Sequence, residues 1–132
     1  MEAPSIPEPV LNEEEQAGFR KGVDEFNRGL YFECHDTLEE LWSGIRGPGR
    51  DFFQGLIQVA VGFQHLANRN LEGARALLRD GATKLAGRRL EGQALSRFAE
   101  EVAGCLGEIV TLGADAIARF DWSRVPRFPA GG

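Results

Sequence analysis

Apolar side chains recur at intervals of three and four residues along most of the chain, a pattern that predicts amphipathic helices. No segment alternates apolar and polar residues as a half-buried strand does. Glycine, proline and asparagine separate five helical segments, which cover about residues 12–29, 30–45, 50–68, 70–87 and 94–112. We therefore predict an all-α fold, a compact array of about five helices.

The segment from about Arg50 to Asn68 is apolar over most of its circumference, so we expect it to be the central, buried helix. Gly55 and Gly62 lie seven residues apart on it and mark a seam where a neighbouring helix can approach closely. Three of its polar side chains line up along a single stripe, at steps of four and seven: Gln54, Gln58 and His65.

The length of 132 residues and the hydrophobic content of 42% leave room for one domain. We expect residues 1–11 to form a flexible acidic leader, residues 12–120 a single helical domain and residues 121–132 an extended tail. Prolines at both ends of the chain disfavour helix there. Three apolar side chains are expected to fix part of the tail to the body: Trp122, Val125 and Phe128.

Charge and hydropathy exclude some classes of protein. The net charge of -5 argues against a dedicated nucleic-acid binder. Two arginine pairs, Arg46 with Arg50 and Arg88 with Arg89, leave an RNA- or nucleotide-associated role as the weakest hypothesis. No apolar run approaches the roughly 20 residues of a membrane-spanning helix, and the acidic start is unlike a signal peptide, so we expect a cytoplasmic protein. Cys34 and Cys105 are too few for a disulfide scaffold and are expected to be small buried apolar groups.

The stretch from Phe26 to Trp42 carries ionisable residues through a helix that otherwise has the pattern of a core element. His35, Leu38, Glu39 and Trp42 fall on one face of this helix, at spacings of three and four. Burying an imidazole and a carboxylate costs free energy unless they find partners, so this face predicts either a structural network or a chemical site.

A metal site is one interpretation of these residues. If the helices over residues 30–45 and 50–68 pack face to face, His35 and Glu39 can meet Gln58 and His65. Two imidazoles and a carboxylate suit zinc or another divalent metal, which makes His35, Glu39 and His65 the candidate ligands. In the other interpretation, which the sequence favours, each histidine donates one hydrogen bond within a polar seam that fixes helix register without a ligand. Glu33 and Asp36 lie on neighbouring faces as further ligands or as groups that orient an imidazole.

Arg50, at the start of the central helix, also has two interpretations. Beside free backbone N–H groups its guanidinium could bind a phosphate or a carboxylate. More often such an arginine pairs with an acidic neighbour, here Glu39, Glu40 or Asp51.

Two motifs resemble those of a small prokaryotic family, the domain of unknown function number 309. They are Phe26-Asn27-x-Gly29-x-Tyr31-Phe32-Glu33-x-His35-Asp36-x-Leu38-Glu39-x-x-Trp42 and Arg50-x-Phe52-x-Gln54-Gly55-Leu56-Ile57-Gln58-x-Ala60, followed by His65 and by Asn70-x-x-Gly73-Ala74. The resemblance covers about residues 11–112, and Asp36 stands where the family usually has glutamate. It implies a compact all-α fold and no particular activity. The motifs contain every candidate site residue: Glu33, His35, Glu39, Arg50, Gln54, Gln58 and His65.

Two main hypotheses of function follow. The first is a non-catalytic helical domain with a buried polar His/Glu/Gln network, which acts through a protein partner or as a homo-oligomer. The second is a metal-dependent or acid–base enzyme, hydrolase-like, that uses His35, Glu39 and His65, with Arg50 orienting an anionic substrate.

Overall fold

The structure, a computed structural model, describes residues 8–47, 49–90 and 93–129. Helices dominate it, which confirms the all-α prediction. The helical elements are α1 (Glu13–Asn27), α2 (Tyr31–Ser43), α3 (Gly49–Ala67), α4 (Leu71–Leu85), α5 (Ser96–Leu112), η1 (Gly113–Asp115), α6 (Ala116–Arg119) and η2 (Trp122–Arg124). In the described part of the chain the strands are β1 (Arg89–Leu90) and β2 (Gln93–Ala94).

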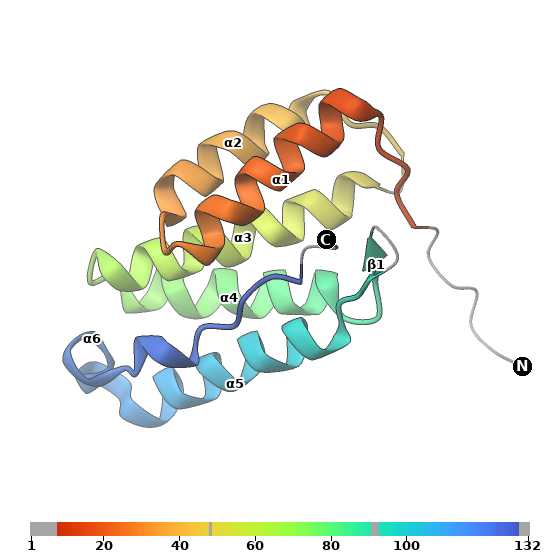
Figure 1. The fold of residues 1–132 in the computed structure, drawn as a ribbon. Helices are drawn as coiled ribbons and strands as arrows, with labels where there is room; N and C mark the ends of the chain where they lie inside the picture. Colours follow the sequence, from red (N-terminus) through yellow and green to blue (C-terminus); the bar gives the residue numbers. More distant parts are fainter. Residues whose placement is uncertain (1–7, 48, 91–92, 130–132) are drawn as a thin grey trace, which may run out of the picture.

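The main helices pack in the order in which they follow one another along the chain. Figure 1 shows α1 and α2 side by side on one flank of the α3–α4 pair, with α5 on the other flank. The most extensive helix–helix contact joins α3 to α4, and α2 connects α1 to α3. The chain after α6 then runs back along α5 towards α1. Within the described residues no helix is long and apolar enough to cross a membrane.

Local chemistry sets several helix ends. Asn12 and Glu15 form a reciprocal capping box at the start of α1: the Glu15 N–H donates to Asn12 Oδ1 (2.8 Å) and the Asn12 N–H to Glu15 Oε1 (3.0 Å). Gly29 follows α1 with φ of 76°, a conformation that glycine adopts at little cost. Asn70 caps α4 by accepting the Gly73 N–H (3.0 Å).

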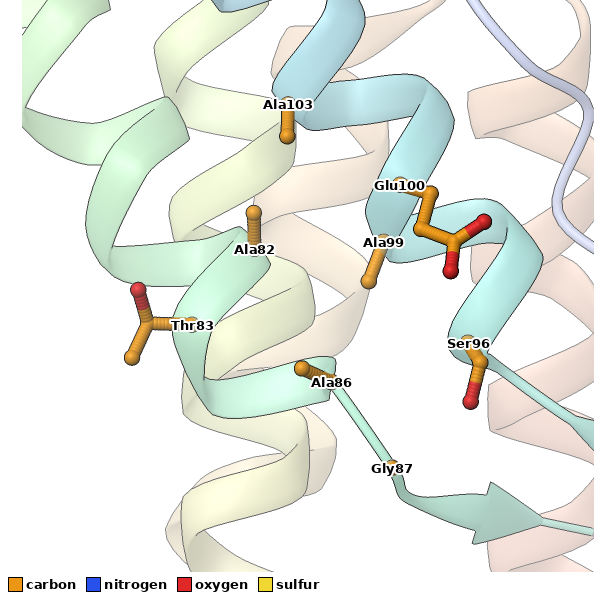
Figure 2. Close-up of a pocket in the computed structure, with 8 residues that line it drawn as sticks. All are labelled: Ala82, Thr83, Ala86, Gly87, Ser96, Ala99, Glu100 and Ala103. Carbon is orange, nitrogen blue, oxygen red and sulfur yellow. The ribbon is translucent and has the colours of Figure 1, made fainter.

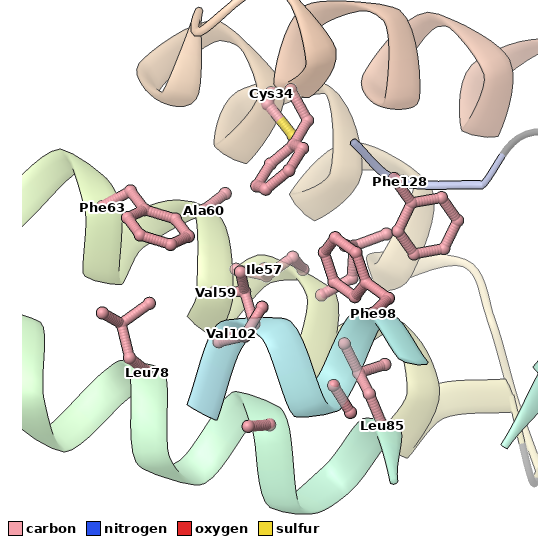
Figure 3. Packing of buried hydrophobic residues seen from close by; sticks show 14 of the residues in the cluster. Cys34, Ile57, Val59, Ala60, Phe63, Leu78, Leu85, Phe98, Val102 and Phe128 are labelled. Atoms are coloured by element: carbon pink, nitrogen blue, oxygen red, sulfur yellow. The ribbon is translucent and has the colours of Figure 1, made fainter. Parts of the chain in front are cut away.

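The central helix is α3, as predicted. Phe52, Phe53, Val59, Ala60 and Phe63 on it are 0% exposed, and Figure 3 shows side chains of α3, α4 and α5 interdigitating around it. The predicted glycine seam is also confirmed, because it faces α4: a methyl group built on Gly62 would lie 2.8 Å from Leu78 Cδ2, and one on Gly55 would lie 2.8 Å from Lys84 Cβ. The backbones of α3 and α4 can approach closely only because these side chains are absent.

The segment between α4 and α5, where the sequence shows no strand pattern, contains a small antiparallel hairpin. Arg89 pairs with Ala94 and Leu90 with Gln93, and the Leu95 N–H donates to the Arg88 carbonyl (2.9 Å). Leu90 and Leu95 are buried at 2% and 0% exposure, so the hairpin closes one end of the core. Strands of two residues are too short to show an alternating pattern in the sequence.

The C-terminal segment is fixed to α1 through one side chain. Asn27 accepts the Phe128 N–H at Oδ1 (2.7 Å) and donates its amide to the Phe128 carbonyl (3.2 Å). The Phe128 ring is 3% exposed and lies 4.9 Å from the Phe98 ring and 5.6 Å from the Phe19 ring, between centroids. The division into leader, domain and tail stays a prediction, and residues 1–7 and 130–132 lie outside the described part of the chain.

Candidate functional site

One face of α2 points away from the core. Cys34 and Leu38 are 0% exposed, whereas Phe32 is 56% exposed. Three polar side chains, spaced three and four residues apart, share this face of α2 with Phe32. We call the set of Phe32, His35, Asp36 and Glu39 the α2 stripe. The α2 stripe therefore presents an aromatic ring, an imidazole and two carboxylates to solvent.

His35 and Glu39 contact each other within the stripe. His35 Nε2 lies 3.2 Å from Glu39 Oε2, and the side chains are 27% and 52% exposed. Asp36 joins them, since one ligand atom from each of the three side chains lies within 4.8 Å of the others. In the described part of the chain this is the one group of three or more His, Cys, Asp or Glu side chains arranged in that way.

The other predicted ligand, His65, makes its contact elsewhere. Its Nδ1 lies 3.4 Å from Asn70 Nδ2, in the turn between α3 and α4. Gln58 likewise faces α4 and accepts a hydrogen bond from Lys84 Nζ (3.1 Å). Gln58 and His65 thus make their described side-chain contacts with α4 and the turn before it, and not with α2. The sequence held a signal for this, because Gln58 and Gly62 are four residues apart and Gly62 belongs to the seam that admits α4.

Arg50 links the end of α2 to the start of α3. Its guanidinium lies over the Trp42 ring, with Cζ 3.9 Å from the centroid, and donates to the carbonyls of Trp42 (3.3 Å) and Ile45 (3.2 Å). The Trp42 indole N–H donates in return to the Arg50 carbonyl (2.9 Å). Arg50 therefore satisfies backbone acceptors at the C-terminus of α2, and its described contacts include neither an anion site nor the acidic neighbours considered above.

The remaining candidates, Glu33 and Gln54, lie outside the group of His35, Asp36 and Glu39. Glu33 is exposed on α2, outside the His35–Asp36–Glu39 group, and Gln54 is half-buried on α3. The candidate polar residues thus make separate local contacts on α2 and at the border of α3 with α4.

The buried thiols are poor nucleophiles. Burial, together with the negative charge of Glu25, raises the pKa of Cys34 to about 12, and burial raises the pKa of Cys105 to about 11. Burial also raises the pKa of Tyr31 to about 12. All three groups stay protonated at neutral pH, and a protonated thiol is unreactive. Both cysteines are buried and free, as predicted.

Two of the surface concavities lie between neighbouring main helices. The one between α4 and α5, about 450 Å³, is lined mainly by small side chains, with Glu100 as its carboxylate (Figure 2). The other, about 420 Å³, lies between α1 and α2, with Gly18 and Leu41 among its lining residues. Neither is lined by a residue of the α2 stripe, so the stripe is arranged as a surface and not as the wall of either cleft.

Comparisons with known proteins show a likeness to one family and give no activity. Residues 19–77 match the family model described as "Domain of unknown function (DUF309)". The uncharacterized protein YpuF of Bacillus subtilis (strain 168) is 41% identical over 49 residues, which are 36% of this chain and 28% of YpuF. The matched part of the chain therefore spans less than a third of that relative. No solved structure matches the chain.

Proposed function

We propose that this protein, whose residues 19–77 match the DUF309 family model, is a non-catalytic interaction module whose binding surface is the α2 stripe. The observation that carries the proposal is Phe32, a ring 56% exposed on the same helix face as His35, Asp36 and Glu39. Aromatic side chains surrounded by polar groups are frequent anchors of protein–protein interfaces.

The charge of α2 supports a binding role. The helix carries four carboxylates and neither lysine nor arginine: Glu33, Asp36, Glu39 and Glu40. Such a surface attracts a basic partner and disfavours an acidic one. The protonated state of both buried thiols also favours binding over nucleophilic catalysis.

The experiment compares Phe32→Ala with Val110→Ala, which removes an exposed side chain of similar exposure (55%) from α5. The free energy of unfolding of each variant should lie within about 0.5 kcal/mol of the wild-type value, because neither side chain is buried. Each variant is produced at native abundance in the cells to which the protein belongs, and the cells are treated with a cross-linker. The proteins that co-purify with each variant are then quantified. A protein that is lost with Phe32→Ala and kept with Val110→Ala supports the proposal. Identical profiles for both variants contradict it.

A divalent-metal site is the second candidate, and the convergence of His35, Asp36 and Glu39 favours it. An imidazole nitrogen and two carboxylate oxygens are ligands that Zn²⁺, Mn²⁺ and Co²⁺ accept. Three protein ligands would leave coordination positions for water, which is the arrangement of a hydrolase-like enzyme. This set keeps two of the ligands predicted from the sequence and replaces His65 with Asp36.

The two histidines provide matched variants for this candidate. The protein is purified without an affinity tag and titrated with ZnCl₂ by calorimetry, together with His35→Ala and His65→Ala. We expect one zinc per chain, bound by the wild type and by His65→Ala and lost in His35→Ala. Equal loss in both variants would restore the ligand set predicted from the sequence, and absence of binding to the wild type would exclude the site.

A further inference from the structure

The groove between α1 and α2 has a chemical character of its own. Its volume is about 420 Å³, and its lining includes Glu14, Lys21, Glu40, Leu41 and Gly18. The groove has free space above Gly18. A methyl group built at this position would have one neighbour within 4 Å, Leu41 Cδ1 at 3.8 Å. The groove thus combines Gly18 and the apolar side chain of Leu41 with carboxylates on both helices.

The groove lies in the most acidic part of the molecule. Residues 13–43 contain nine acidic and three basic side chains, a net charge of -6, whereas the whole chain has a net charge of -5. The rest of the chain is therefore slightly basic, and the α1–α2 pair is a separate negative surface. Such a surface attracts cations, and a groove concentrates the field.

Two carboxylates of the groove have no partner among the described contacts. Glu15 accepts the N–H of Asn12 in the capping box, but the side-chain carboxylates of Glu14 and Glu40 make no hydrogen bond or ion pair within the described residues. The groove contains one cation, Lys21, for three carboxylates. It therefore has unused acceptor capacity for a cationic group.

We propose that the groove between α1 and α2 binds an arginine side chain of the protein that docks on the α2 stripe; this rests on the function proposed above. The aliphatic part of an arginine can lie over Gly18 and Leu41 while its guanidinium reaches Glu14 and Glu40. A guanidinium is less strongly hydrated than an ammonium and pairs with carboxylates through several N–H groups, so arginine fits better than lysine.

The probe is a hexa-arginine peptide, acetylated and amidated, at an ionic strength of about 0.05 M, where charge screening is moderate. Binding is measured by calorimetry, and its place by amide chemical shifts in ¹⁵N-labelled protein. We expect saturable binding with shifts centred on Gly18, Thr37 and Leu41. A hexa-lysine peptide should bind more weakly.

Gly18→Leu and Gly107→Leu form a matched pair that leaves the charge unchanged. The first fills the groove, and the second adds the same side chain on α5, where nothing lies within 4 Å of the new Cβ. We expect Gly18→Leu to weaken peptide binding at least tenfold and Gly107→Leu to leave it unchanged. Glu40→Gln should weaken binding several-fold and Glu100→Gln should not, which keeps the test valid if Gly18→Leu folds poorly.

Three results would overturn the inference: no saturable binding, shifts centred elsewhere, or equal binding by Gly18→Leu and Gly107→Leu. Peptide binding by Phe32→Ala separates this proposal from the interaction proposal. If Phe32→Ala binds the peptide normally but loses no cellular partner, the groove binds arginine and the α2 stripe is not an interface. If the partner is lost with Phe32→Ala but the groove variants bind the peptide like the wild type, only the arginine inference fails.

Discussion

Arg50 and Trp42 fasten α2 to α3 in both directions: the guanidinium lies 3.9 Å from the indole centroid, and the indole N–H donates to the Arg50 carbonyl at 2.9 Å. The guanidinium also donates to the carbonyls of Trp42 and Ile45. One side chain thus supplies both a cation–π contact and a cap for the last turn of α2. Arg50 and Trp42 both belong to the motifs that carry the family resemblance, and these contacts give each of them a structural role.

Arg50→Lys is expected to destabilise the protein by about 1–2 kcal/mol, because lysine keeps the charge but loses the planar stacking and the forked N–H donors. The free energy of unfolding is measured by urea denaturation, with Arg20→Lys on the exposed side of α1 as the control. In a double-mutant cycle, Arg50→Lys and Trp42→Phe should be non-additive. Additive effects would show that the two side chains do not act together.

Two glycines of α1 should respond oppositely to alanine. A methyl group on Gly22 would lie 2.6 Å from Leu38 Cδ2, and Leu38 is 0% exposed, so Gly22→Ala should destabilise by about 1–3 kcal/mol. Gly18 has space, so Gly18→Ala should stabilise α1 by about 0.5–1 kcal/mol through higher helix propensity. Thermal melts of both variants check this, and a change of the same sign in both would contradict the packing between α1 and α2.

Much of the fold follows from local rules in the sequence. Helical periodicity, the Asn12–Glu15 capping box and the Asn70 cap place the helices to within a few residues. The seam of Gly55 and Gly62 predicts a close helix neighbour, and α4 occupies that position. The hairpin around Leu90 could not be predicted, because two strands of two residues leave no periodic signal.

The candidate site was harder to derive, since it depends on which helices face each other. His35 and Glu39 meet because they lie four residues apart on one helix, and spacing alone predicts that contact. Whether His65 reaches them depends on tertiary packing, and both His65 and Gln58 make their contacts with α4 and the turn before it. Arg50 had several chemically reasonable partners, and its choice of backbone carbonyls and an indole ring depends on the angle between α2 and α3.

Asn27→Ala should release the C-terminal segment from α1. Asn27 makes two hydrogen bonds to the Phe128 backbone, 101 residues away, and their loss leaves a partly buried N–H and carbonyl unpaired, at a cost of about 1–3 kcal/mol. Hydrogen exchange of the Phe128 amide should accelerate more than that of amides in α3. Uniform acceleration would instead indicate that Asn27 contributes only to global stability.

The stability of the protein should decline in alkaline solution, and Cys34 should account for part of the decline. Its thiol has a pKa of about 12 in the folded chain against an ordinary value of 9.0, because burial disfavours the thiolate. Between these values the unfolded chain releases the proton and the folded chain keeps it. The contribution of this thiol to the free energy of unfolding should therefore stay constant up to about pH 9. Above that pH it should fall by at most about 1.4 kcal/mol per pH unit. The measurement is urea denaturation at pH 8, 9 and 10, with the midpoints converted to free energies of unfolding. These free energies should fall less steeply with pH in Cys34→Ala than in the wild type. Equal slopes would show that the thiol has the same pKa in the folded and the unfolded chain.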